Sequence, residues 1–135
     1  MSDWNKKIIE EFRANDGKVG GPYEGNTLLI LHTTGAKSGK EHVNPLVTFE
    51  DNNRLVVVAS KGGAPSHPDW YYNLLANPKV TVEYGNEEFR ARASVASEPE
   101  RTELYEKMES KLAAFTEYKQ KTNRVIPVVT LTRHS

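Results

Sequence analysis

The chain has 135 residues, about the length of one domain, with 18 basic and 18 acidic side chains and no cysteine. The balanced charge gives no overall field that would draw the protein to nucleic acid or to an anionic membrane, so any attraction for an anion has to be local. The lack of cysteine excludes a disulfide framework, a thiolate nucleophile and an iron–sulfur site.

The first predicted element is an amphipathic helix from Asp3 to about Ala14. The apolar residues Trp4, Ile8, Ile9 and Phe12 recur there at helical spacing, and charged residues fill the other face. We expect this helix, in an N-terminal segment of residues 1–20, to dock on its own domain, while a membrane surface or a partner remains an alternative for a single stripe. Since no apolar run approaches the roughly 20 residues that span a bilayer, we expect a cytoplasmic protein with no transmembrane segment.

The next predicted elements are strands, because short apolar or alternating runs are separated by turn residues. They cover residues 28–32, 42–50 and 54–60. Pro45 lies inside the second of them, which predicts a sheet edge or a bulge, since proline cannot donate to a sheet ladder.

The rest of the chain continues with helices and strands in alternation. The predicted elements are a short helix near 68–76, a hairpin of strands 79–84 and 87–95 joined at Gly85-Asn86, a helix with an apolar stripe at Leu104, Met108, Leu112 and Phe115, and a last strand at 125–132. Six strands with three helices among them favour an α+β fold, a small antiparallel barrel with helical covers that spans residues 1–135 as one domain.

Several common active-site motifs are missing. The segment from Gly35 to Lys40 resembles a nucleotide P-loop, but its glycines are too close together and Glu41 stands where Ser or Thr is required. No Gly-x-Gly-x-x-Gly opens a helix after a strand, and the four histidines lack metal-ligand spacing. We therefore expect neither a Rossmann site nor a metal site.

Two loops combine lysine with glycine in positions that favour an anion. The first places Lys37, Ser38, Gly39 and Lys40 in one turn between strands, where glycine lets backbone N–H groups approach a ligand. The second places Lys61-Gly62-Gly63 after a strand and before a helix whose first N–H groups are unpaired. Either loop alone fits a solvated turn equally well, but the two together favour a phosphate or another oxyanion.

The combined pattern of these loops and their surroundings resembles the deazaflavin-dependent nitroreductase family. The similar segments are Thr33-Thr34-Gly35-Ala36-Lys37-Ser38-Gly39-Lys40, Val43-Asn44-Pro45-Leu46, Ala59-Ser60-Lys61-Gly62-Gly63-Ala64 and Pro68-x-Trp70-Tyr71-x-Asn73-Leu74-x-Ala76-Asn77-Pro78. The resemblance runs from about Leu28 to Val129. It implies a split β-barrel of the FMN-binding type and the deazaflavin coenzyme F-420, an 8-hydroxy-5-deazaflavin whose phosphate and oligoglutamate tail are anionic.

The resemblance also implies which residues hold the cofactor. It assigns the phosphate and tail to Lys37, Ser38, Gly39 and Lys40, the pocket wall to Asn44 and Pro45, the ring to Ala59, Ser60, Lys61, Gly62 and Gly63, and the closing side to Trp70 and Asn73. Since the ring carries the hydride chemistry, the protein has to supply orientation and charge. Our catalytic candidates are Ser60 and Lys61 beside the ring, with Lys61 stabilising negative charge, and Tyr118 as a proton donor or a packed aromatic.

The resulting hypothesis is a coenzyme F-420-dependent reductase that passes a hydride to a small, flat, electron-poor acceptor, such as a quinone, an enone or a nitroarene. An FMN oxidoreductase on the same barrel and a non-catalytic deazaflavin carrier or sensor are the alternatives. An RNA-binding barrel is disfavoured by the zero net charge and by the few aromatics among the basic residues. The sequence leaves the oligomeric state open.

Overall fold

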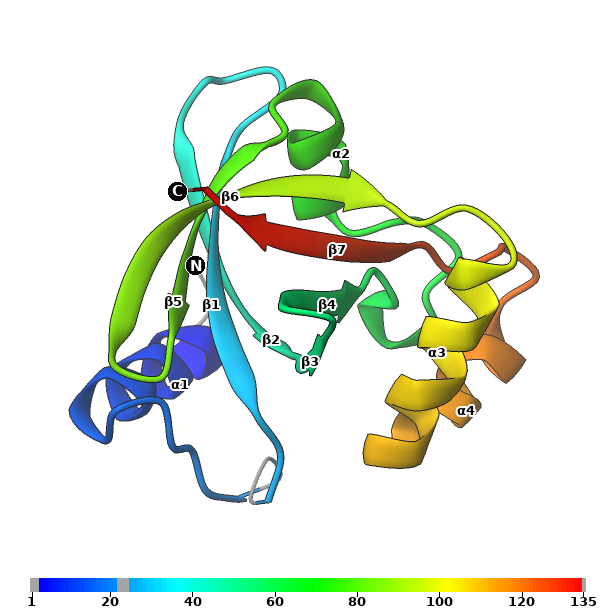
Figure 1. Cartoon of the computed structure of the whole chain (residues 1–135), viewed down its shortest axis with the longest axis horizontal. Coiled ribbons are helices and arrows are strands. Elements are labelled where there is room, and N and C mark those ends of the chain that lie inside the picture. Colours follow the sequence, from blue (N-terminus) through cyan, green and yellow to red (C-terminus); the bar gives the residue numbers. More distant parts are fainter. Residues whose placement is uncertain (1–2, 22–24, 135) are drawn as a thin grey trace.

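The predicted strands form one curled antiparallel sheet in the computed structural model, which describes residues 3–21 and 25–134 (Figure 1). The strands are β1 (Leu28–Thr34), β2 (Glu41–Val47), β3 (Phe49–Asp51), β4 (Arg54–Val58), β5 (Lys79–Tyr84), β6 (Glu87–Val95) and β7 (Val128–Arg133). The helices are α1 (Asp3–Ala14), α2 (Asp69–Ala76), α3 (Glu100–Lys111) and α4 (Ala114–Lys121), with a 3-10 turn η2 (Lys61–Gly63) after β4. The strand order is β2-β1-β5-β6-β7-β4-β3, which confirms the α+β antiparallel barrel.

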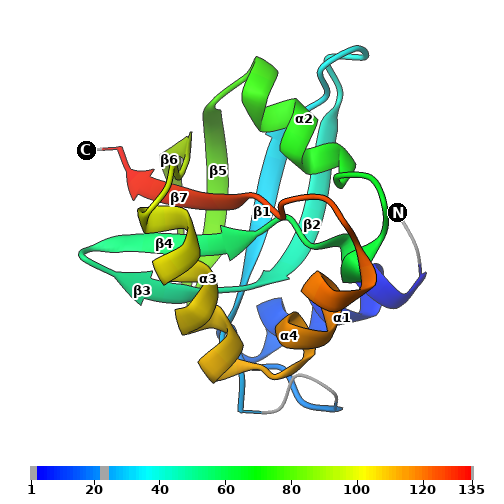
Figure 2. The ribbon, with the colours of Figure 1, turned by 90° about the vertical axis from the view of Figure 1, so that its right-hand side faces the viewer.

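A single bent stretch of chain forms both edges of this sheet. β2 and β3 lie at opposite ends of the strand order, yet Thr48 alone separates them (Figure 2). The Thr48 side-chain oxygen donates to the carbonyl of Val56 at 2.7 Å, and its backbone N–H donates to the carbonyl of Thr27 at 2.9 Å. The bend closes the sheet into a barrel and leaves β2 with one hydrogen-bonded neighbour, β1. Pro45 therefore lies on an edge strand, as its place in the sequence predicts.

Apolar residues on both faces of the central strands explain their continuous apolar runs. In β1, Leu29 and Leu31 pack inside the barrel, while Leu28 and Ile30 pack under α1. β4 alternates in the same way between the barrel interior and the cluster under α3 and α4. A strand buried on both faces shows no polar alternation, which is why its sequence is apolar throughout.

Helix α1 docks on the outside of the barrel, as expected for its apolar stripe. Ile8, Ile9 and Phe12 are buried against the sheet, whereas Trp4 is 52% exposed. Residues 15–20 continue as turns and loop, in agreement with the predicted N-terminal segment. Within the described residues, no helix has the length and apolar character that crossing a bilayer requires.

An ion-pair network ties α1 to the sheet. Arg13 donates from Nε and Nη2 to the two carboxylate oxygens of Glu83, at 2.9 and 2.8 Å. His32 lies between Glu83, at 2.6 Å, and Glu41, at 3.3 Å. The hydrogen bond from Arg13 and, to a smaller extent, that with His32 hold the pKa of Glu83 below its ordinary value. His32, Glu83 and Glu88 are close enough together to hold a metal ion, but Arg13 occupies both oxygens of Glu83, so the geometry is that of an ion-pair network.

The structure corrects three predicted boundaries. The strand predicted at 42–50 is divided at Thr48, so the sheet has seven strands rather than six. The helix predicted through Phe115 ends at Lys111, and α4 begins anew at Ala114, because Leu112 adopts an extended backbone with φ −148° and ψ 111°. The last strand, predicted from 125, begins at 128, directly after Pro127, because proline cannot donate to the ladder, and it lies between β6 and β4.

Candidate functional site

Two hollows lie at the two ends of the open edge strand β2. The first, here called the loop hollow, has a volume of about 570 Å³ and is lined by Gly35, Ala36, Lys37, Ser38, His42, Asp69, Tyr72 and Asn73. The second, here called the apolar hollow, has a volume of about 150 Å³ and is lined by Leu28, Pro45, Leu46, Val47, Val58, Ser60, Gly62, Leu112, Phe115 and Tyr118. β2 contributes to both, with His42 in one and Pro45 in the other. The two positions are three steps apart in the extended chain, which corresponds to about 10 Å.

The loop between β1 and β2 is held in shape by its own backbone and by α2. The Gly35 N–H donates to the carbonyl of Lys40 at 2.7 Å, which closes the turn. The Ala36 N–H donates to Oδ1 of Asn73 at 3.0 Å, and Asn73 Nδ2 donates to Thr33 Oγ1 at 3.2 Å. Asn73 is only 6% exposed, so it clamps the loop from inside. The predicted tail-binding turn is therefore a fixed part of the fold.

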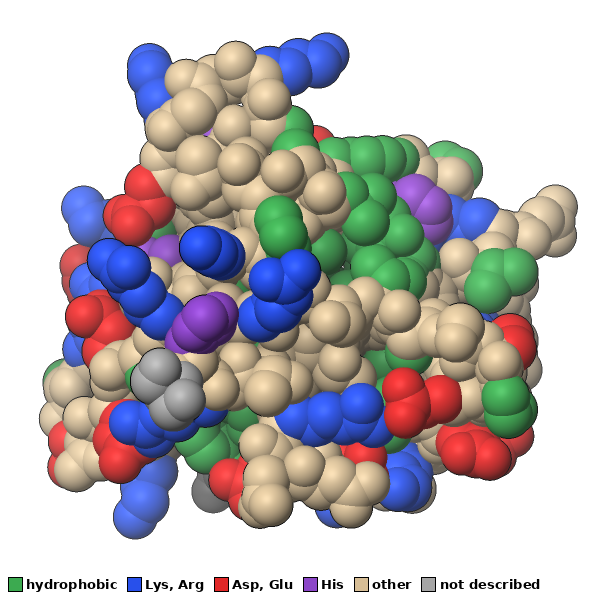
Figure 3. Space-filling model, turned by 45° about the horizontal axis from the view of Figure 1, so that its top comes forward, with side chains coloured by type: hydrophobic (Ala, Val, Ile, Leu, Met, Phe, Trp, Pro, Cys, Tyr) green, Lys and Arg blue, Asp and Glu red, His purple; other side chains and the backbone are tan. Residues whose placement is uncertain are grey.

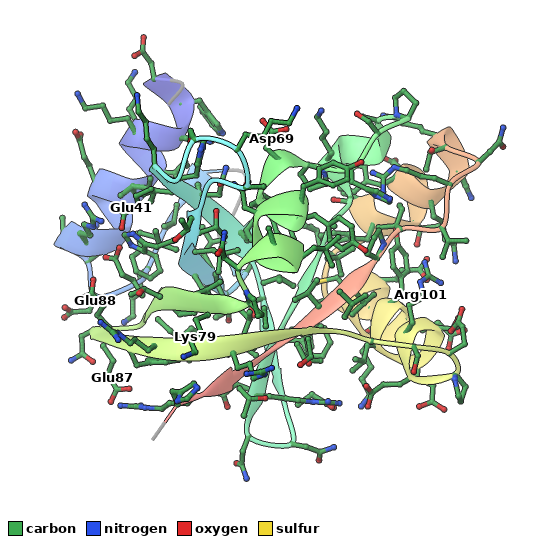
Figure 4. The ribbon with its side chains drawn as sticks, turned by 90° about the horizontal axis from the view of Figure 1, so that it is seen from above. Glu41, Asp69, Lys79, Glu87, Glu88 and Arg101 are labelled. Carbon is green, nitrogen blue, oxygen red and sulfur yellow. The ribbon has the colours of Figure 1, made fainter. Side chains whose placement is uncertain are left out.

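The charges around the loop hollow are mixed. Lys37 lines it with Ser38, while Lys40 completes the turn beside them. Asp69 lines the same hollow from the start of α2, where Figure 4 shows it beside this loop. On the top of the molecule, hydrophobic side chains gather in one area and basic side chains are spread beside it (Figure 3). An anion in this hollow would meet the lysines on the loop side and a carboxylate on the helix side.

The turn after β4 presents three backbone donors. Ser60 has right-handed dihedral angles, φ −78° and ψ −37°, and it is followed by left-handed residues, Lys61 with φ 47° and Gly62 with φ 63°. A right-handed residue followed by a left-handed one turns successive N–H groups toward a common point, which forms an anion-binding nest. In the part of the chain that the structure describes, the N–H groups of Ser60, Lys61 and Gly62 have no hydrogen-bond acceptor. Ser60 and Gly62 also line the apolar hollow, so the nest borders it.

The carbonyl side of the same turn is held by a residue that the sequence analysis did not identify, Arg124. Its guanidinium donates to the carbonyls of Ala59 at 3.1 Å, Ser60 at 2.6 Å and Ala64 at 2.9 Å. It also donates to Nδ1 of His67 at 2.9 Å. Arg124 follows α4 in the chain and is about 60 residues away from these partners. No local pattern marks such a contact.

Helix α4 closes the apolar hollow with aromatic side chains. The rings of Phe115 and Tyr118 meet edge to face at 5.3 Å between centroids, and both line the hollow. The hydroxyl of Tyr105 donates to the carbonyl of Phe115 at 2.6 Å, and burial raises the pKa of Tyr105 to about 12. Gly63 lies so close to this helix that a β-carbon there would be 2.8 Å from the carbonyl oxygen of Tyr118. The absence of a side chain at this position lets α4 approach the turn.

The structure does not bring every predicted site residue to a hollow. Trp70 is 5% exposed and packs in the barrel core, and Ala59 is fully buried behind the nest. Asn44 lies on β2 between the two hollows and lines neither. The side chain of Lys61 turns to Ser66, with Nζ 3.3 Å from the hydroxyl oxygen, so its N–H rather than its ammonium group belongs to the nest.

The apolar hollow combines an apolar wall with backbone donors at its border. Aromatic and aliphatic side chains wall the apolar hollow, and three unpaired N–H groups stand at its border. Such donors match an aromatic ring system whose edge carries oxygen or nitrogen acceptors. The loop hollow, at the other end of β2, has the side chain of Lys37 in its lining, a positive charge that would favour an anionic group.

The family of this chain follows from comparison with known proteins. Residues 4–133 match the family described as F420H(2)-dependent quinone reductase. A protein of that description from Mycobacterium tuberculosis is 37% identical over 126 residues, which cover 90% of this chain and 85% of the relative. A solved structure of an F420-H2 dependent reductase is 39% identical, with a TM-score of 0.71 over 77% of this chain and 92% of that chain.

Two further solved structures extend the comparison of the fold. One, described as a domain-swapped dimer, is 35% identical with a TM-score of 0.73 over 96% of this chain and 97% of that chain. A FAD-binding protein from Mesorhizobium loti, 16% identical with a TM-score of 0.55, shares the barrel fold. The match covers 100% of this chain and 90% of that protein. The resemblance of the lysine and glycine loops to a deazaflavin-dependent family is thereby confirmed, as is the split barrel. The chain belongs to the family of quinone reductases that depend on reduced coenzyme F-420, and coenzyme F-420 is its cofactor.

Proposed function

We propose that this protein reduces a quinone, with the deazaflavin ring in the apolar hollow and its anionic tail at the loop hollow. The observation that carries the proposal is the nest of three unpaired N–H groups beside an apolar wall, because it matches a flat ring with an acceptor edge. The bound deazaflavin would supply the hydride. The residues of this chain would bind and orient the ring and exclude water from it.

In this proposal the two ends of the cofactor are held by different interactions. Lys37, Ser38 and Lys40 would bind the phosphate and the glutamate tail by charge and hydrogen bonds. The N–H groups of Ser60, Lys61 and Gly62 would bind the pyrimidine edge of the ring. The separation of about 10 Å along β2 leaves room for a linker between ring and phosphate.

Tyr118 is the proposed proton donor on the acceptor side. A quinone that accepts a hydride also needs one proton to become a hydroquinone, and Tyr118 contributes to the wall of the apolar hollow. Tyr118→Phe is expected to lower kcat about 100-fold, the lower end of the range for a general acid, while the affinity for the deazaflavin stays the same. Tyr84→Phe is the matched control, since Tyr84 lies on β5 and lines other hollows.

The primary experiment measures binding and turnover separately. Fluorescence titration gives the affinity for the complete cofactor and for a deazaflavin riboside that lacks the phosphate and tail. Lys37→Ala is expected to weaken only the complete cofactor, and to make that binding less sensitive to salt. Lys79→Ala serves as the control, because this lysine lies on β5 away from the loop hollow (Figure 4).

Turnover is then followed by the loss of reduced-cofactor absorbance when menadione is added. The proposal predicts oxidation of the cofactor that depends on both menadione and protein. Failure of the wild-type protein to bind the deazaflavin would refute the assignment of the site. Binding without menadione-dependent oxidation would favour a carrier over a quinone reductase.

A further inference from the structure

The contacts of Arg124 are directed at the two peptide units that build the nest. Its Nη1 donates to the carbonyl of Ala59 and its Nη2 to the carbonyl of Ser60, at 3.1 and 2.6 Å. In a planar trans peptide, the carbonyl of Ala59 shares one unit with the N–H of Ser60, and the carbonyl of Ser60 shares one with the N–H of Lys61. Because C=O and N–H point in opposite directions, carbonyls drawn to Arg124 turn these two N–H groups away from it, toward the nest.

The positive charge of Arg124 has no carboxylate partner among the described residues. Its side-chain partner is the ring of His67, and Tyr72 and Tyr105 are the titratable groups near enough to influence its pKa. Partial burial lowers the pKa of Arg124, yet an arginine stays charged at any ordinary pH. An arginine N–H can only donate, so Nδ1 of His67 accepts, and burial together with Arg124 lowers the pKa of His67 and keeps its ring neutral.

A partly buried charge without a counter-ion is unusual, since charges removed from water are normally paired. Here the charge lies behind two peptide dipoles of about 3.5 D each, with their positive ends at the nest. The guanidinium polarises these two peptides from their carbonyl ends. A negative charge on a ligand at their N–H ends would balance the positive charge of Arg124. The arrangement thus favours an anion on the edge of a ring in the apolar hollow.

We propose that Arg124 is a positioning residue for the cofactor ring, which holds two nest peptides in place and makes the nest selective for the ionised ring. The proposal rests on the proposed function, because it requires the deazaflavin to lie in the apolar hollow. Arg124 acts through the Ala59–Ser60 and Ser60–Lys61 peptides and does not itself touch the ring. Ionisation of the 8-hydroxyl group spreads negative charge over the ring system to its pyrimidine edge, where the nest donors would stabilise it.

The test is an absorbance titration of the bound, oxidised deazaflavin between pH 4 and pH 9, which reports the ionisation of the ring without turnover. The titratable group in contact with Arg124 is His67, whose pKa is lowered by burial and by Arg124 and is expected to rise when Arg124 is replaced. The ratios are therefore compared at pH 7.5 and above, where the His67 ring is neutral in every variant, and Lys61 beside the nest is unchanged throughout. In Arg124→Met, the ratio of ionised to neutral ring at a given pH is expected to fall about tenfold, as estimated from one charge acting through partly screened dipoles. In Arg124→Lys the charge remains but the fork of donors is lost, so an intermediate ratio is expected.

Arg101→Met is the matched control. Arg101 is also partly buried and donates from Nε to a backbone carbonyl, that of Ile126 at 2.9 Å, but it lies on α3 (Figure 4). Its loss should lower stability without changing the ratio of ring forms. An unchanged ratio in Arg124→Met, or an equal change in Arg101→Met, would overturn the proposal.

The outcomes also separate this inference from the proposed function. If the wild-type protein binds no deazaflavin, the proposed function fails and the role of Arg124 fails with it. If wild type and variant bind it with equal ratios of the two ring forms, only the role of Arg124 fails. If Arg124→Met does not fold, the titration of Arg124→Lys tests the proposal. A lower ratio of ionised to neutral ring than in the wild type would support it, and an unchanged ratio would overturn it.

Discussion

Alanine at Gly63 is expected to push α4 away from the turn after β4. A β-carbon there would be 2.8 Å from the carbonyl oxygen of Tyr118 and 2.9 Å from Cβ of Lys121, both closer than real β-carbons come to such atoms. The backbone of Gly63 is also left-handed, with φ +82°. The left-handed conformation costs alanine about 1 to 2 kcal/mol and overpacking about 1 to 3 kcal/mol, so we expect a loss of about 2 to 5 kcal/mol in the free energy of unfolding.

Gly62→Ala separates the two contributions. Gly62 is left-handed as well, with φ +63°, but a β-carbon there would meet no atom within 4 Å. For Gly62→Ala, only the cost of the left-handed backbone, about 1 to 2 kcal/mol, is expected. Alanine also lowers the conformational entropy of the unfolded chain, but this effect is the same in both variants and cancels in the comparison. Urea unfolding of both proteins should give Gly63→Ala the lower stability by about 1 to 3 kcal/mol. Equal losses would show that the packing of α4 against the turn does not limit this position.

Two further predictions concern one buried hydrogen bond and one ion pair at the surface. Tyr105→Phe removes the hydrogen bond to Phe115 and should cost about 1 kcal/mol at pH 7, measured by urea unfolding. Since the pKa of Tyr105 is raised from 10.0 to about 12, the wild type should lose this advantage as the pH rises through that interval, and a constant difference would contradict the assignment. Glu83→Gln weakens the pairing with Arg13 and should cost about 1 kcal/mol at pH 7. Because the pKa of Glu83 is lowered from 4.5, its contribution is fully present above 4.5 and is lost as the pH falls through the lower folded-state pKa. The difference between the two proteins should therefore shrink steadily as the pH is lowered from 4.5, and a constant difference would contradict the assignment.

The parts of the fold that sequence could predict are those fixed by local signals. The hairpin of β5 and β6 has its turn at Gly85-Asn86, and α2 ends before Asn77-Pro78, because turn residues and proline act within a few positions. The break between α3 and α4 carries no such signal. Leu112 and Phe115 continue the helical spacing, and the extended backbone at Leu112 is imposed by packing in the tertiary structure.

The same division applies to the candidate site. Lys37 and Ser38 could be located from a lysine and glycine turn, and the structure places them in the lining of one hollow. Gly62 and Gly63 indicate a turn with left-handed backbone after β4, because glycine adopts positive φ without strain. The left-handed conformation of Lys61, on which the nest depends, has no such signal in the sequence. Arg124 could not be predicted at all, because its role depends on contacts across about 60 residues of chain.

The strand β2 works as a spacer of fixed length between the two hollows. His42 and Pro45 are pinned in register against β1, so neither end of the site can slide relative to the other. Deleting one residue between them would shorten the spacer by about 3.3 Å and turn every side chain beyond the deletion to the opposite face. If the ring and the tail lie as proposed, the number of residues in this edge strand sets the distance that the cofactor has to span. A molecule with a shorter link between its ring and its charged group would then reach only one of the two hollows.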